Sequence, residues 1–156
     1  ALVKPYGEIA ARLMERFWPG PLPIVLPVRE GAVSPRVTAG LDTVAVRMPD
    51  HPVALELIRA SGCPIAAPSA NRSGRPSPTR AEHVRADLAG RIAGIVDGGA
   101  PGGGVESTVV EVNVNDGSIH VLRPGGITPA MLKEVSPRVT IDPAVDPERG
   151  MLRELP

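Results

Sequence analysis

The sequence predicts an α/β fold in which helices flank a mixed sheet, and three observations support this expectation. First, 42% of the 156 residues are hydrophobic, and most of these are aliphatic, which is enough for the core of one domain. Second, short apolar runs typical of strands alternate with segments whose apolar residues have helical spacing. Third, 19 prolines and 17 glycines separate these runs, which indicates short elements joined by rigid turns.

Composition also excludes several classes of function. The 17 basic and 17 acidic residues cancel, which argues against a strongly non-specific nucleic-acid binder. The single cysteine, Cys63, excludes an internal disulfide and fits a cytoplasmic protein. No apolar run reaches the roughly 20 residues of a membrane span. No basic-then-apolar leader is present, and the start at Ala1 fits a processed chain or part of a longer product.

Two common kinds of catalytic centre are absent from the sequence. The three histidines are scattered and show no spacing typical of a zinc or di-metal site. No G-x-S-x-G motif or Ser/His/Asp set marks a nucleophile. We therefore expect no metal ligand from the protein and no catalytic side-chain nucleophile, so that an enzyme of this sequence works by positioning and electrostatics.

The first elements are a helix and an irregular strand. Apolar residues recur at helical spacing from Tyr6 to Trp18, and Pro19-Gly20-Pro21 ends that helix. We expect Trp18 to pack on the core rather than to stack on a base. Residues 22–28 are rich in β-formers but interrupted by Pro23 and Pro27, which predicts an edge or irregular strand.

A loop over residues 30–41, with or without a short strand, leads to a strand at residues 44–46 and then to Arg47. From the residues alone, Arg47 is more often a salt-bridge partner than a ligand clamp. A helix follows from His51 to Ser61. The expected salt-bridge partners of Arg47 are Asp42, Asp50 and Glu56, and the expected buried face of the helix is Val53, Leu55, Leu57 and Ile58.

The most informative stretch runs from Pro64 to Thr79. Ile65-Ala66-Ala67 predicts a buried strand that Pro68 ends, and a loop of small polar side chains follows. Thr79 and Glu82 form a capping box ahead of a helix over residues 80–88. A strand that leads into hydroxyls and a helix N-terminus is typical of phosphate or carboxylate binding, whereas composition alone favours a solvated turn.

The last third predicts three strands and a short helix. The strands cover residues 92–96, 109–114 and 119–122, and Asn115-Asp116-Gly117 predicts a hairpin turn between the second and third. The glycine cluster at residues 97–104 fits neither a Walker nor a Rossmann motif. We expect these glycines instead to let the backbone pass close to a ligand or another strand. Thr128 caps a helix to Val135, and residues 136–156 read as a proline-spaced exposed tail or linker after a domain over 1–135.

Several literal strings resemble the YrdC-type threonylcarbamoyl-AMP synthase family. They are residues 64–79 (PIAAPSANRSGRPSPT), 45–49 (AVRMP), 104–110 (GVESTVV), 122–128 (LRPGGIT) and 17–22 (FWPGPL). They keep the family's order and span the chain from Tyr6 to Leu132. The resemblance implies a YrdC/DHBP-synthase-like twisted mixed sheet flanked by helices, with a ligand cleft where the loop, Arg47 and Ser107 converge.

The resemblance also implies an activity. L-threonine, bicarbonate and ATP give threonylcarbamoyl-AMP and pyrophosphate, which serves threonylcarbamoyladenosine modification of tRNA, with Mg²⁺ as cofactor and tRNA or a downstream transferase as partner. The family's threonine contacts correspond to Arg47, the backbone of Ala67, and Ser107. Its ATP contacts correspond to Thr43, Ser69, Ser77 and Arg123, with Asn71 supporting the loop.

One departure from the family pattern concerns the amino-terminal side. The family begins with a Thr-x-Thr-x-Tyr-Gly segment and a Lys-x-Arg-Pro segment, and neither occurs in these 156 residues. Those segments supply part of the threonine pocket and the principal phosphate-binding cations. We therefore expect this chain alone to be a poor synthase. At the other end, residues 147–152 match the linker of long members only faintly.

Two alternative functions stay open. One is a non-catalytic RNA-binding module, whose phosphate contacts would come from arginines around the loop, although net charge and the scarcity of aromatics argue against it. Those arginines are Arg72, Arg75, Arg80 and Arg85. The other is a carbamoyl-transfer domain that uses carbamoyl-phosphate instead of threonine and bicarbonate.

Overall fold

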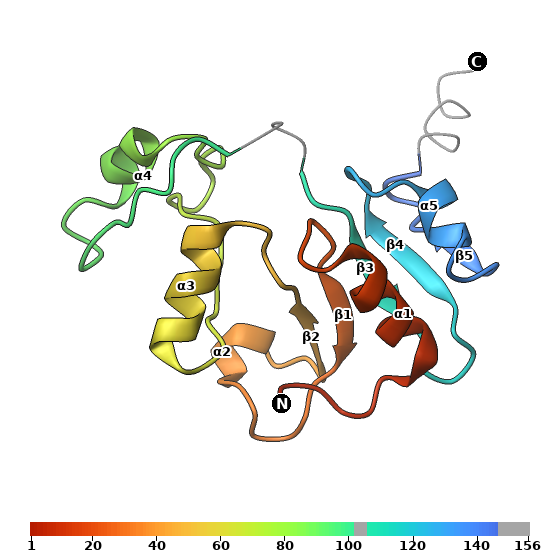
Figure 1. Ribbon diagram of the computed structural model, residues 1–156. Coiled ribbons are helices and arrows are strands. Elements are labelled where there is room, and N and C mark those ends of the chain that lie inside the picture. The colour runs from red at the N-terminus through yellow and green to blue at the C-terminus, as the bar shows by residue number, and fades with distance from the viewer. Residues whose placement is uncertain (102–105, 147–156) are drawn as a thin grey trace, which may run out of the picture. The chain divides into compact units, whose positions relative to one another are not determined.

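A computed structural model describes residues 1–101 and 106–146 of the chain (Figure 1). The contacts divide the chain into two compact units, which we describe separately. The first comprises Ala1–Asp50 and Val105–Pro156, and the second comprises His51–Gly104. The domain boundaries at 1–135 and 136–156 stay predictions.

The first unit contains a five-stranded mixed sheet (Figure 1). Its strands are β1 (Ile24–Pro27), β2 (Thr43–Val46), β3 (Val109–Val112), β4 (Ile119–Arg123) and β5 (Val139–Ile141), in the order β2-β1-β3-β4-β5. The β1–β3 and β4–β5 pairs are parallel, whereas β1–β2 and β3–β4 are antiparallel. The predicted mixed sheet is confirmed.

The core of the first unit joins the sheet to two helices. Alternate residues of β1, β3 and β4 are buried, because side chains two apart in a strand share a face. The helix α1 (Gly7–Phe17) contributes Ala10 and Leu13 to the same cluster, and α5 (Pro129–Lys133) contributes Leu132. Trp18 packs half-buried against this core and donates from Nε1 to the Leu22 carbonyl at 2.8 Å, as predicted.

Residues 22–28 were predicted to form an edge or an irregular strand, and the edge position is wrong, because β1 lies between β2 and β3. Pro27 is the last residue of β1, and its carbonyl accepts from the Lys4 N–H at 3.0 Å. Pro23 precedes the strand, and its carbonyl accepts from the Val110 N–H at 3.1 Å. Because both prolines lie at the ends of the strand, their missing N–H groups leave the ladder between them intact.

Two further predictions for the first unit need correction. The loop at residues 30–41 contains a short helix, α2 (Pro35–Thr38), whose N-cap Ser34 accepts from the Arg36 N–H at 3.3 Å. The exposed tail predicted from Ser136 instead begins with a buried residue and continues into β5, which pairs with β4. The Ser136 hydroxyl donates to the Gly117 carbonyl at 3.0 Å. The proline-spaced sequence of this segment did not indicate a strand. The strand forms because the segment pairs with β4, which is distant in sequence.

The hairpin turn and the last helix cap are confirmed. Gly117 has φ +74°, which a glycine adopts without a Cβ clash, and its N–H donates to the Asn113 carbonyl. The Thr128 hydroxyl accepts from the Met131 N–H at 3.2 Å at the start of α5. The strand predicted over 109–114 ends at Val112, and residues 147–152 lie outside the described residues.

The second unit is built from two helices, α3 (Pro52–Ser61) and α4 (Ala81–Leu88). The strands predicted at residues 65–67 and 92–96 are wrong: both segments lack ladder pairing, and Ile65 is 45% exposed. A strand needs paired neighbours to be stable, and the described part of this unit provides none. The predicted buried face of α3 is also wrong in part, because Val53 and Leu57 are exposed. Among the described residues, no helix is long and apolar enough to cross a membrane.

Candidate functional site

Arg123 and Ser107 are directly joined in the first unit. Arg123 ends β4, and its Nε and Nη2 both donate to the Ser107 carbonyl oxygen, at 3.0 and 2.9 Å. The Arg123 Nε also lies 3.8 Å from the Glu106 carboxylate. The planar guanidinium fork permits this two-pronged contact, which the single point charge of a lysine could not reproduce. Arg123 therefore orients the backbone at Ser107 while its remaining N–H groups stay available.

A second set of contacts holds the same two segments together. We call these segments, residues 106–108 and 123–127, the Ser107 clasp. Thr108 is 1% exposed. Its hydroxyl donates to the Ile127 carbonyl at 2.7 Å and accepts from the Ile127 N–H at 3.0 Å. A Cβ on Gly125 would lie 2.3 Å from the Glu106 carbonyl oxygen and 2.4 Å from the Thr108 nitrogen. Only glycine fits this backbone approach, so the clasp has a defined geometry.

Thr43 and Arg47 lie on and just after β2. Thr43 is half-buried and pairs with Pro27, and Arg47 is exposed at the strand end, where the sequence predicted it. Within the described residues of this unit, Arg47 makes no ion pair, so the predicted salt bridges to Asp42 and Asp50 are wrong. The Gly20 N–H donates to the Met48 carbonyl at 2.9 Å and anchors the segment that follows Arg47.

The signature loop, residues 68–79, lies in the second unit. The Asn71 Nδ2 donates to the carbonyls of Arg72 and Arg75, both at 2.9 Å. The Arg75 N–H donates to the Arg72 carbonyl at 3.0 Å, and Gly74 has φ +83°. Asn71 thus closes a turn within the loop through its own side chain.

The remaining predicted site residues of this unit are exposed to solvent. Ala67, Ser69 and Ser77 are exposed. The hydroxyls of Ser69 and Ser77 have no hydrogen-bond partner within the part of the chain that the structure describes. These hydroxyls are therefore free to bind a polar ligand.

The predicted capping box at Thr79 is wrong. Arg80 occupies the N-cap of α4 and makes no side-chain cap bond. The backbone N–H of Thr79 donates to His83 Nδ1 at 3.3 Å, and the Thr79 hydroxyl lies at the same distance from that nitrogen. His83 thus engages the threonine that the sequence pattern assigned to the cap.

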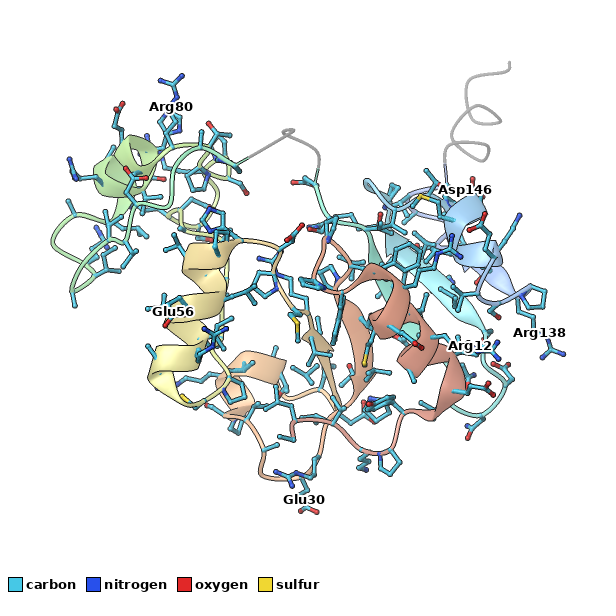
Figure 2. All side chains as sticks on the ribbon, in the orientation of Figure 1. Arg12, Glu30, Glu56, Arg80, Arg138 and Asp146 are labelled. Carbon is cyan, nitrogen blue, oxygen red and sulfur yellow. The ribbon has the colours of Figure 1, made fainter. Side chains whose placement is uncertain are left out.

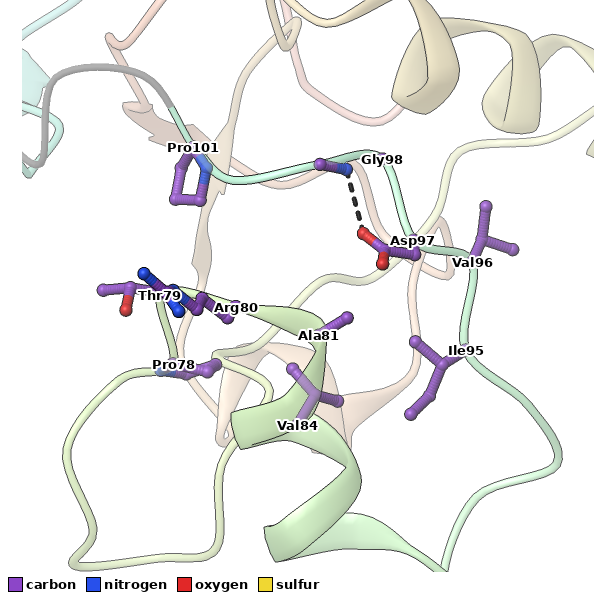
Figure 3. Close-up of a pocket in the computed structure, with 11 residues that line it drawn as sticks. Pro78, Thr79, Arg80, Ala81, Val84, Ile95, Val96, Asp97, Gly98 and Pro101 are labelled. Carbon is purple, nitrogen blue, oxygen red and sulfur yellow. Dashed lines mark hydrogen bonds between the residues drawn. The ribbon is translucent and has the colours of Figure 1, made fainter.

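A pocket of about 190 Å³ lies at the start of α4 (Figure 3). One wall comes from residues 78–81 and Val84, and the other from residues 95–99 and Pro101. The Asp97 Oδ1 accepts from the Gly99 N–H at 2.9 Å. The end of the signature loop therefore borders residues 97–99 across this pocket.

Gly98, in the described part of the glycine cluster, lies close to a histidine. His51 Nε2 lies 3.1 Å from the Gly98 carbonyl, and a Cβ on Gly98 would lie 2.8 Å from His51 Cε1. The His51 Nδ1 accepts from the Val53 N–H as the N-cap of α3. Because Nδ1 accepts, Nε2 is the donor to Gly98. The sequence analysis missed this contact, since no local pattern connects residues 51 and 98.

The fold and this site define the chain as a member of the Sua5/YciO/YrdC family, whose family model, described as "Telomere recombination", matches residues 1–125. A threonylcarbamoyl-AMP synthase of Bacillus subtilis is 61% identical over 141 residues, covering 90% of this chain and 40% of the relative. A threonylcarbamoyl-AMP synthase of Pyrococcus abyssi is 53% identical over 145 residues, covering 92% and 42%.

A solved structure supports the same assignment. The crystal structure of Pyrococcus abyssi Sua5 complexed with L-threonine matches with a TM-score of 0.84 and 51% identity, covering 92% of this chain and 41% of that one. The predicted YrdC-type family and its α/β fold are confirmed. The chain spans about two fifths of the length of these relatives.

Proposed function

We propose that this chain carries part of the site for threonylcarbamoyl-AMP synthesis from L-threonine, bicarbonate and ATP, and that by itself it is a poor synthase. The Ser107 clasp is the observation that carries the proposal. It joins Ser107, assigned by resemblance to threonine, to Arg123, assigned to ATP, through two hydrogen bonds. The reaction must hold threonine and ATP next to each other, and one rigid contact between their residues serves that purpose.

The proposed chemistry needs positioning more than a protein nucleophile. The threonine amine and bicarbonate form a carbamate with loss of water. A carbamate oxygen then attacks the α-phosphorus of ATP, and the bond to the departing pyrophosphate breaks. Arg123 and the exposed hydroxyls of Ser69 and Ser77 stabilise charge on the phosphates, while Arg47 holds the threonine carboxylate. Arg47 is exposed and makes no ion pair within residues 1–101 and 106–146, which is compatible with that role.

Mg²⁺ is proposed as the accompanying cation. Among residues 1–101 and 106–146, no group of three potential ligands from His, Cys, Asp or Glu comes together. Mg²⁺ in nucleotide sites is commonly held by phosphates, water and one or two protein oxygens. By the family resemblance, Mg²⁺ would arrive with ATP and neutralise phosphate charge. We also propose a cytoplasmic location and delivery of the product to a tRNA-modifying transferase.

The RNA-binding alternative has one observation in its favour. The side chains of Arg72, Arg80 and Arg85 make no ion pair within the described residues, and Arg80 projects from the start of α4 (Figure 2). Such side chains could contact phosphates. Steeply salt-dependent tRNA binding without nucleotide binding would favour this alternative.

Calorimetry of the chain with a non-hydrolysable ATP analogue tests the proposal. We expect binding that strengthens when L-threonine and bicarbonate are added, and a loss of that strengthening in Arg123→Ala. The matched control is Arg36→Ala, since Arg36 is exposed in the same unit. No analogue binding, or binding that carbamoyl-phosphate strengthens instead, would overturn the proposal.

A further inference from the structure

Asp87 contacts the signature loop from the last turn of α4. Its Oδ1 accepts from Arg75 Nη1 at 2.6 Å, and its Oδ2 accepts from the Arg72 N–H at 3.4 Å. The Asp87 side chain is 13% exposed, compared with 58% for Arg75. A carboxylate this well shielded needs partners, and these two donors supply them. No local motif links Asp87 to residues 12 and 15 positions earlier in the chain.

The loop turn is therefore held from both sides. Asn71 binds the carbonyls of Arg72 and Arg75 from within the loop, and Asp87 binds donors of the same two residues from α4. The four bonds fix the turn between Asn71 and Arg75, which lies between Ser69 and Ser77. A helix is a rigid support, and groups held by rigid elements are positioned more accurately than groups on free loops.

We infer that Asp87 is a positioning residue for the signature loop, which it orients for the ATP phosphates through Arg72 and Arg75. The inference rests on the proposed function for its ligand, while the contacts themselves lie within one unit. It also changes the interpretation of the loop arginines. The charge of Arg75 is matched by Asp87, so Arg75 serves the loop rather than a nucleic-acid phosphate.

Variants at both ends of the contact test this inference. Asp87→Asn keeps the size of the side chain and removes its charge, and Arg75→Ala removes the partner. We expect each to weaken binding of a non-hydrolysable ATP analogue by about 10- to 150-fold, the range of a hydrogen bond to a charged group converted to affinity. The affinity of the double variant for the analogue should be no lower than that of the single variant that binds more weakly, because the pair acts as a unit. Glu82→Gln is the control, since this exposed carboxylate lies on the same helix.

Amide hydrogen exchange at Arg72 supplies a readout that needs no nucleotide. We expect protection in the wild-type chain, loss of protection in Asp87→Ala, which removes the acceptor of the Arg72 N–H, and no change in Glu82→Gln, while circular dichroism shows all three folded. Unchanged Arg72 exchange in Asp87→Ala would overturn the inference. So would lost protection with unaltered analogue binding. If the wild-type chain binds no analogue, the proposed function fails, and the Arg72 exchange alone decides whether Asp87 positions the loop.

Discussion

Arg123 donates two hydrogen bonds to the carbonyl oxygen of Ser107, from Nε at 3.0 Å and from Nη2 at 2.9 Å. The two residues are 16 positions apart; Arg123 ends β4, and Ser107 precedes its antiparallel neighbour β3. The family resemblance assigns them to different substrates. Their contact therefore gives the proposed threonine and ATP subsites a common support.

Arg123→Lys tests whether that support matters. Lysine keeps the charge but cannot form the planar two-pronged contact. We expect weaker binding of both L-threonine and an ATP analogue, each by roughly tenfold, which corresponds to about 1.4 kcal/mol. Calorimetric titration measures both affinities, with Arg36→Lys as the control. A loss confined to the ATP analogue would show that Arg123 contacts nucleotide without supporting Ser107.

Thr108→Val removes the buried hydroxyl of the Ser107 clasp without changing side-chain size. The Ile127 N–H and carbonyl then lose their partner. Each buried polar group left without a partner costs about 1–3 kcal/mol of folding free energy. We expect a clearly lower urea midpoint, followed by the fluorescence of Trp18, the single tryptophan.

Thr108→Ser is the matched control, because it retains the hydroxyl and loses only a methyl group. Its expected destabilisation is smaller than that of the valine variant, about 1 kcal/mol. Equal stability of the valine variant and the wild type would contradict a structural role for the hydroxyl.

Gly125→Ala adds one carbon where the backbone of residues 106–108 lies within 2.6 Å of the added atom. Backbone atoms cannot rotate away as a flexible side chain can, so the clasp must open. We expect destabilisation of roughly 1–3 kcal/mol or more by thermal unfolding. The control is Gly94→Ala, where a Cβ meets nothing within 4 Å. Similar melting temperatures for both variants would refute the close approach at Gly125.

Asp116 provides a pH-dependent prediction. Hydrogen bonds from the side chain and then the backbone N–H of Ser118 lower the pKa of Asp116 below its ordinary value of 3.8. Because the folded pKa is lowered, the stabilising contribution is present in full above the ordinary value. It is lost as pH falls through the folded pKa. Asp116→Asn should therefore lower stability at neutral pH and converge with the wild type in acid.

The measurement for Asp116 is urea unfolding at several pH values between neutral and strongly acidic. Asp50→Asn serves as the control at an exposed carboxylate. A stability difference that is unchanged across this range would argue against the Asp116–Ser118 hydrogen bonds.

Local patterns in the sequence determined the elements that depend on neighbouring residues. Helical spacing predicted α1, the Asn115-Asp116-Gly117 turn predicted the β3–β4 hairpin, and Thr128 predicted the cap of α5. The literal strings predicted the family. These features could be predicted because the residues that produce them are close together in the chain.

Only the tertiary structure decided the contacts between distant segments. It placed β1 inside the sheet despite its flanking prolines, paired β5 with β4, and left residues 65–67 without a strand partner. It also joined Thr108 to Ile127 and Asp87 to the signature loop. Strand neighbours and buried hydrogen bonds depend on which distant segments pack against each other. The composition and residue spacing within one segment do not specify its partner.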